Sequence, residues 1–358
     1  MDFFQSDLHP SKHHTLVTII ASQKKPQMRQ RSCPHQKMQR LLLVCSVMFF
    51  TSCAHTPRRA QAVHALPLPA EIAAYYDYPD HAPVATIQLI KEYRNFRVAL
   101  VRFPLSTPSG VESTEPIVEF EWFESKRLGR RAAIVFNPIL GGDYPLERSV
   151  CRFFASRGYH VALVHRKTLK ISPAQRAEQL ELLLRQGILR IRQVVDWMTT
   201  NERVDPHRLG SFGISMGGIA SEIAAAVEPR LRVHVIALAG GSIADIVSAS
   251  HDPLIARPRR RYLERNHISR EDMYRILKEG ITTDPLRMAP YVDRDRLLMF
   301  ITLADRTIGT SNAFRLWHAL GQPRAVFLPA GHYTAYLLLP YIKYASLQFF
   351  DTMLGPGS

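Results

Sequence analysis

Cysteine is scarce in this sequence of 358 residues, and its placement excludes two kinds of stabilisation. There are four cysteines, and three of them, Cys33, Cys45 and Cys53, precede the part of the chain with a globular pattern. A disulfide framework needs paired cysteines within the folded domain, and zinc sites need closely spaced cysteine or histidine ligands. Neither pattern is present, so we expect no disulfide scaffold, no metal and no cofactor. Cys151 is expected to be a small buried residue of a helix.

Acidic residues are fewer than basic ones, 31 against 46, which gives a formal net charge of +15. About half of this excess lies in residues 1–62, and the rest is diffuse apart from a cluster at residues 257–265. No zinc-finger, helix-turn-helix or stacking-aromatic pattern accompanies the charge, so we expect no nucleic-acid partner. The cluster at 257–265 predicts a solvated charged face, with attraction of an anionic substrate or of lipid headgroups as the alternative.

The apolar run at residues 41–50 is too short to span a bilayer, but it has the length of a signal-peptide core. It ends in Phe50-Thr51-Ser52-Cys53, which is similar to a bacterial lipoprotein processing box, although that box usually has leucine where Phe50 stands. We therefore expect residues 1–52 to be a leader and signal peptide. Cys53 is then the lipidated residue of an exported cell-envelope lipoprotein, anchored to a membrane on the periplasmic side. A cleaved signal peptide without lipid and a cytosolic protein with an unusual leader are the alternatives.

The rest of the chain has the size and the apolar content of one large domain with an insertion. We expect residues 53–86 to be a tether and lead-in, and residues 87–355 to form the domain. Residues 96–103 and 116–123 alternate apolar and polar side chains, which predicts an antiparallel pair of strands at an edge. No internal repeat is present.

Strands and helices then alternate through the middle of the chain. Apolar runs that predict buried strands occur at residues 131–137, 160–165, 209–212, 233–239, 297–303 and 325–328, with amphipathic helical patterns between them. One of these patterns predicts a long helix that starts at Ser172 and Pro173 and ends near Thr199. This alternation favours a mostly parallel sheet with helices on both faces.

Residues 242–284 interrupt this alternation. They contain a basic stretch at 256–263 that Pro258 is expected to break, and a short helix opened by Ser269 with Asp272 three residues later. We predict a small helical insertion that lies above the strand ends as a cap.

The most informative stretch contains Gly213, Ser215 and Gly217, which match the G-x-S-x-G pattern of a nucleophile elbow. In such an elbow a strand enters a tight turn and then a helix, and the turn exposes the serine hydroxyl. Glycine two residues before and two residues after the serine lets the strand and the helix pack closely. The alternative is an ordinary turn with a serine that faces solvent.

A serine nucleophile needs a base within hydrogen-bond reach and a third group that orients the base. Asp305 and His332 each follow a predicted strand, at the end where functional groups of a parallel sheet gather. They come in the order Ser, Asp, His, which is the order of α/β-hydrolases. His318 and His251 are weaker candidates for the base, and Asp284 is the second candidate for the acid.

With these residues in place, residues 87–354 resemble an α/β-hydrolase. The run from Val204 to Gly218 is similar to the elbow of the dienelactone hydrolase, acetylxylan esterase and prolyl-oligopeptidase-like branch. The resemblance implies an α/β-hydrolase fold, Ser215 as nucleophile, His332 as general base and acid, and Asp305 as the residue that orients His332.

Two backbone N–H groups have to stabilise the oxyanion, and one normally belongs to the residue after the nucleophile, here Met216. The other is expected from the loop after residue 137. The family often has His-Gly there, whereas this chain has Asn137-Pro138. Proline cannot donate, so Ile139 is the first choice and Leu140 the second.

The sequence thus predicts a serine hydrolase that cleaves a small-molecule ester or other acyl substrate through an acyl-enzyme. Esterase is favoured over peptidase because no propeller or extended peptide-binding domain precedes the hydrolase. The alternatives are an acyltransferase or peptidase of the same fold, and a non-catalytic membrane-anchored lipoprotein that binds a lipid or a partner.

Overall fold

The computed structural model describes residues 54–55, 65–79, 83–108, 113, 115–141, 144–166 and 177–355. The expectations for residues 1–52, for lipidation of Cys53 and for a helix start at Ser172 and Pro173 fall outside these ranges. In the described ranges, no helix combines the length and the apolar character that crossing a membrane requires.

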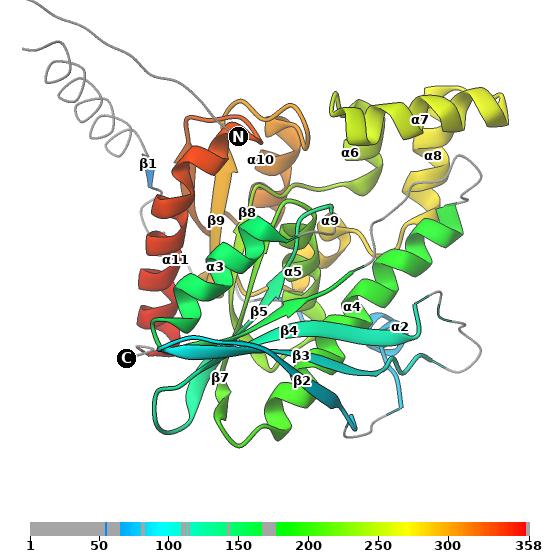
Figure 1. Ribbon diagram of the computed structural model, residues 1–358. Coiled ribbons are helices and arrows are strands. Elements are labelled where there is room, and N and C mark those ends of the chain that lie inside the picture. The colour runs from blue at the N-terminus through cyan, green and yellow to red at the C-terminus, as the bar shows by residue number, and fades with distance from the viewer. Residues whose placement is uncertain are drawn as a thin grey trace, which may run out of the picture. The chain divides into compact units, whose positions relative to one another are not determined.

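Among the described residues, ten strands form one sheet in the order β1-β10-β9-β8-β7-β5-β6-β4-β3-β2 (Figure 1). The strands are β1 (Ala54–His55), β2 (Thr86–Glu92), β3 (Phe96–Pro104), β4 (Ile117–Ser125), β5 (Arg131–Asn137), β6 (His160–Val164), β7 (Val204–Ile214), β8 (Leu231–Ala237), β9 (Leu297–Thr302) and β10 (Arg324–Leu328). The six adjacent strands β6, β5, β7, β8, β9 and β10 all pair in parallel, so their carboxyl ends meet at one edge of the sheet.

The helices connect and cover these strands. They are α2 (Ala70–Tyr75), α3 (Pro145–Ala155), α4 (Ala177–Thr200), α5 (Met216–Val227), α6 (Ile243–Ala249), α7 (Pro253–Asn266), α8 (Arg270–Gly280), α9 (Pro285–Met288), α10 (Thr310–Ala319) and α11 (Leu339–Leu354). Three 3₁₀ turns, η1 (Ala289–Tyr291), η2 (Arg294–Arg296) and η3 (Thr334–Leu338), complete the described elements.

Two apolar cores lie on the two faces of the sheet. On one face α4 and α5 contribute Leu184 and Ile223, which pack against strand residues such as Leu209. On the other face α3 and α11 contribute Phe154 and Phe350, whose rings stack edge to face. Because successive strand residues point to opposite faces, β7 supplies both cores. The predicted α/β fold, with a mostly parallel sheet between helices, is confirmed.

The predicted antiparallel edge pair is also confirmed, as β3 and β4, with Val101 opposite Phe120. β2 extends this edge and pairs antiparallel with β3. The opposite edge differs from expectation, because Ala54 and His55, placed in a tether by the sequence, pair antiparallel with β10. Their backbone supplies hydrogen-bond partners that an edge strand otherwise leaves to water.

Two further expectations about helices are wrong, and both involve proline. The last helix does not run from Tyr333, because η3 precedes it and α11 begins at Leu339 with Pro340 in its first turn. Proline lacks an N–H and is best tolerated in the first turn of a helix, so the α-helix starts there. Pro258 lies inside α7, where it removes a single hydrogen bond without ending the helix.

Residues 242–284 hold α6, α7 and α8, which lie beside the carboxyl ends of the strands and are called the cap below (Figure 1). Ser269 and Asp272 form the expected capping box of α8. Residues 65–79, part of the expected lead-in, are hydrogen-bonded to the domain. Tyr75 donates to Glu181 of α4 over 2.7 Å, and Tyr76 donates to Thr283 over 2.9 Å.

Candidate active site

Ser215 stands at the junction of β7 and α5, in a backbone conformation that few side chains adopt. Its φ is 57° and its ψ is −120°, which holds the serine on a tight turn after the strand. The neighbours explain why two glycines flank it. A Cβ on Gly213 would lie 1.9 Å from the carbonyl oxygen of Gly217, and a Cβ on Gly217 would lie 2.0 Å from that of Asn137. Only glycine fits at both positions, and the predicted elbow is present.

His332 lies within hydrogen-bond distance of both Ser215 and Asp305, although the three residues are far apart in the chain. Asp305 follows β9 and His332 follows β10, at the same edge as Ser215. His332 Nε2 is 3.0 Å from Ser215 Oγ, and His332 Nδ1 is 2.8 Å from Asp305 Oδ2. With Nδ1 protonated, the imidazole donates to Asp305 and can accept the serine proton at Nε2. The structure therefore joins the three residues that the sequence placed at strand ends.

Asp305 is almost fully buried and well provided with donors. Its Oδ1 accepts the N–H groups of Thr307 and Ile308, both over 2.9 Å, and its Oδ2 accepts the Thr302 hydroxyl over 2.8 Å. Burial alone raises the pKa of this carboxyl. The hydrogen bond and positive charge of His332, together with the donors at Ile308 and Thr302, outweigh burial and hold the pKa below its ordinary value. The residue is thus a fixed anion behind the imidazole.

The weaker candidates lie elsewhere. His318 on α10 is exposed and contacts Gln322, and His251 is exposed before α7. Asp284 is buried at the start of α9, where it accepts the N–H groups of Leu286 and Ile243. None of these three is within hydrogen-bond distance of Ser215.

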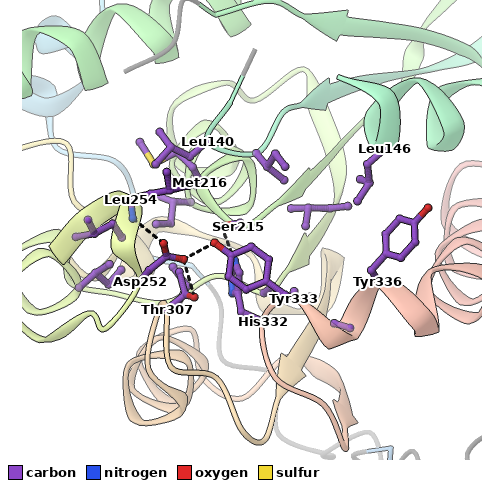
Figure 2. A pocket seen from close by; sticks show the side chains of 18 of the residues that line it. Leu140, Leu146, Ser215, Met216, Asp252, Leu254, Thr307, His332, Tyr333 and Tyr336 are labelled. Carbon is purple, nitrogen blue, oxygen red and sulfur yellow. Dashed lines mark hydrogen bonds between the residues drawn. The ribbon is translucent and has the colours of Figure 1, made fainter. Parts of the chain in front are cut away.

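The two expected oxyanion donors differ in their surroundings. Met216 is the first residue of α5, so its N–H has no acceptor within the helix. The Ile139 N–H instead donates to Glu147 Oε1 over 3.1 Å, so it is engaged before any substrate arrives. Leu140, the second choice, is the next residue of the loop with an N–H group. Figure 2 shows Leu140 and Met216 close together near Ser215.

Residues that the sequence analysis missed hold this loop in place. Asn137 donates from Nδ2 to Ser221 Oγ of α5 over 2.8 Å, and Arg166 donates to the carbonyl oxygen of Ile139. Glu147 is 1 % exposed and lies three residues before Val150 on the inward face of α3. The sequence does carry a sign of this role, because Glu147 is a carboxylate on the otherwise apolar face of α3. Nothing in the sequence indicates a partner for Arg166.

A cavity of about 580 Å³ opens beside Ser215 (Figure 2). Aliphatic side chains from α4, α5, the cap, the loop after β5 and α11 form most of its wall. Its polar residues are Ser215, His332, Asp252, Thr307, Tyr333 and Tyr336. In the described part of the chain, no group of His, Cys, Asp or Glu residues is placed to hold a metal ion.

Asp252 of the cap is hydrogen-bonded to Tyr333, the residue that follows His332. Its carboxylate accepts the Tyr333 hydroxyl and, over 3.0 Å, the Thr307 hydroxyl, while its other oxygen caps α7 at the Leu254 N–H over 2.9 Å. Burial and the Asp252 carboxylate raise the pKa of Tyr333 to about 12, so its phenol stays a donor at neutral pH. These contacts fix the cap beside the site.

The sheet order, the elbow and the strand-end histidine define an α/β-hydrolase, and the chain is a serine hydrolase of this type. More narrowly, it belongs to the prolyl oligopeptidase family, whose model matches residues 147–328. This match includes the elbow and Asp305 and ends just before His332. No curated protein matches the sequence.

Solved structures share the fold at low sequence identity. Acetyl xylan esterase 1 from Thermoanaerobacterium sp. JW/SL YS485 is 17% identical, with a TM-score of 0.58 over 79% of this chain and 96% of its own. An acetyl xylan esterase from Paenibacillus sp. R4 is 17% identical, with a TM-score of 0.60 over 82% and 97%. A hyperthermophilic esterase from the archaeon Pyrobaculum calidifontis is 14% identical, with a TM-score of 0.50 over 79% and 88%.

Proposed function

We propose that this protein hydrolyses carboxylic esters through an acyl-enzyme formed on Ser215. The observation that carries the proposal is the unbroken chain of hydrogen bonds from Ser215 Oγ through His332 to Asp305. A hydroxyl becomes a useful nucleophile when an oriented base accepts its proton during attack.

The reaction follows from these positions. Ser215 Oγ attacks the ester carbonyl carbon while its proton passes to His332 Nε2, and Asp305 stabilises the imidazolium. The carbonyl oxygen becomes an oxyanion that accepts the N–H groups of Met216 and Leu140. When the intermediate collapses, His332 returns the proton to the leaving alcohol. A water molecule then repeats the sequence on the acyl-enzyme and releases the acid.

Ester hydrolysis is favoured over peptide hydrolysis by the wall of the cavity. A peptide carries an N–H and a C=O group at every residue, and each loses water on entry. The aliphatic wall offers them no partners, and the polar groups of Asp252, Thr307 and Tyr333 already bond to one another. An ester has fewer polar groups to satisfy. The structural neighbours that are named as esterases agree with this choice, although they share only the fold.

The test is to compare the wild type with Ser215→Ala. We expect the wild type to hydrolyse p-nitrophenyl butyrate and to be labelled by a fluorophosphonate probe. Ser215→Ala should lose the label and at least about a thousandfold in kcat. Ser311→Ala, which changes an exposed serine of α10, is the matched control and should keep both.

Three outcomes count against the proposal. An unlabelled wild type without ester turnover indicates a protein that binds rather than cleaves. Labelling that survives in Ser215→Ala assigns the nucleophile to another residue. Turnover of peptide substrates with no turnover of esters indicates a peptidase.

A further inference from the structure

We propose that the cavity beside Ser215 binds the aliphatic acyl chain of a medium-length ester, of about six to ten carbons. The chain lies beneath the cap, between α4, α6 and α7. This inference rests on the proposed function and adds the class of acyl group to it.

The wall residues that α4, α6 and α7 contribute are all aliphatic. They include Leu180 and Leu184 of α4, Ile246 and Val247 of α6, and Ile255 of α7. Leu184 and Ile246 are buried, and the other three are half-buried. Methylene groups leaving water for such a wall gain free energy in proportion to the area that they bury.

The same wall disfavours polar and charged acyl groups. The hydroxyls of Thr307 and Tyr333 bond to Asp252, and the polar atoms of Ser215 and His332 take part in the reaction itself. Along the aliphatic side chains of α4, α6 and α7, a sugar hydroxyl or a second carboxylate would lose its hydrogen bonds to water and gain none. A small acetyl group would leave most of the 580 Å³ unfilled and forfeit the apolar contacts.

The two sides of Ser215 differ in the side chains that line them. Figure 2 shows Leu254 and Leu140 on one side of Ser215, and Leu146 and Tyr336 on the other. The helices α4, α6 and α7 contribute aliphatic side chains, whereas Tyr336 presents a phenol and is 62% exposed. The acyl chain therefore occupies the side beneath the cap, and the alcohol leaves along Tyr336.

The experiment measures kcat/KM for the p-nitrophenyl esters of acetate, butyrate, octanoate and palmitate. The leaving group is constant, so only the acyl chain varies. We expect kcat/KM to rise about 700-fold from acetate to octanoate, since each of the six added methylenes contributes about a threefold gain when it is buried. It should fall again for palmitate, whose chain is longer than the cavity accommodates.

Val247→Trp tests the location. It fills the part of the cavity beneath the cap, so we expect a loss of at least about tenfold on octanoate and less than about twofold on acetate. Ala249→Trp is the matched control, because Ala249 lies on the same helix but is exposed and outside the wall. It should leave the whole ester series unchanged. Leu180→Ala, which lengthens the cavity, should raise the ratio of palmitate to octanoate turnover even where Val247→Trp fails to fold.

The outcomes separate this inference from the proposed function. Labelling of Ser215 by the fluorophosphonate, combined with a preference for acetate, overturns the acyl site and leaves the esterase intact. Equal losses on all esters in Val247→Trp, with Ser215 still labelled and the palmitate ratio of Leu180→Ala unchanged, also overturn it. An unlabelled Ser215 overturns the proposed function itself.

Discussion

The sheet and the cap both border the cavity, but they are built in different ways. In β7 every residue from Leu209 to Ile214 is buried, and α5 behind it is buried along most of its length. In α7 of the cap no residue is buried. The sheet thus fixes the positions of the reacting groups by close packing, whereas α7 covers them with far less apolar contact.

Polar contacts take the place of apolar packing where α7 meets the rest of the protein. Asp252 caps this helix and binds Tyr333 and Thr307. Arg259 donates to the carbonyl oxygens of Val247 and Ser250, 2.8 and 2.9 Å away. Each such bond contributes only about 1 kcal/mol net, which is less than the burial of one large apolar side chain. Substitutions in the sheet should therefore disturb chemistry and folding, and substitutions at the cap should disturb substrate binding.

Asp305→Asn is expected to have the largest effect, a fall in kcat of about 10⁴ with little change in folding. The asparagine amide can donate to His332 Nδ1, where Asp305 accepts in the wild type. This favours the tautomer with the proton on Nε2, which cannot accept the proton of Ser215. Steady-state turnover of p-nitrophenyl butyrate measures the change, and Asp295→Asn, at an exposed acid, is the control. A kcat within tenfold of the wild type would contradict the role given to Asp305.

Gly217→Ala should destabilise the protein by about 3 kcal/mol or more, because its Cβ would lie 2.0 Å from the Asn137 carbonyl oxygen and strain the elbow. Gly187→Ala on α4 is the matched control. There a Cβ meets nothing within 4 Å, and the gain in helix propensity should stabilise the protein by roughly 0.5–1 kcal/mol. Urea unfolding of both variants gives the comparison, and equal stabilities would show that the elbow is not packed as described.

Tyr333→Phe is expected to have the smallest effect and to change the cap alone. It removes the hydroxyl that binds Asp252, so amide hydrogen exchange in α7 should become roughly fivefold faster and KM should rise by a similar factor. Because the pKa of Tyr333 is about 12, both effects should stay constant between pH 6 and pH 9. Tyr344→Phe, at an exposed tyrosine of α11 outside the cavity wall, is the control. A large fall in kcat with unchanged exchange would mean that Tyr333 acts on His332 instead.

Local patterns predicted much of the site because its parts lie at strand ends. Ser215 was identified from the glycines around it, and Asp305 and His332 from the apolar runs before them. Glu147 was missed, since its contact with Ile139 spans eight residues across a loop that no periodic pattern describes. The hydrogen bond of the Ile139 N–H was missed for the same reason, and the second oxyanion donor stays a prediction.

The sequence by itself determined the order of strands and helices, the elbow and the positions of three functional groups, because each depends on spacing over a few residues. Only the tertiary structure decided that the Ile139 N–H donates to Glu147, and that α4 and the cap line an apolar cavity. These features depend on side chains such as Leu184 and Val247, which are distant in sequence and meet only after the sheet has brought their helices together. Burial and hydrogen bonding between distant segments are properties of the folded chain, so no local pattern specifies them.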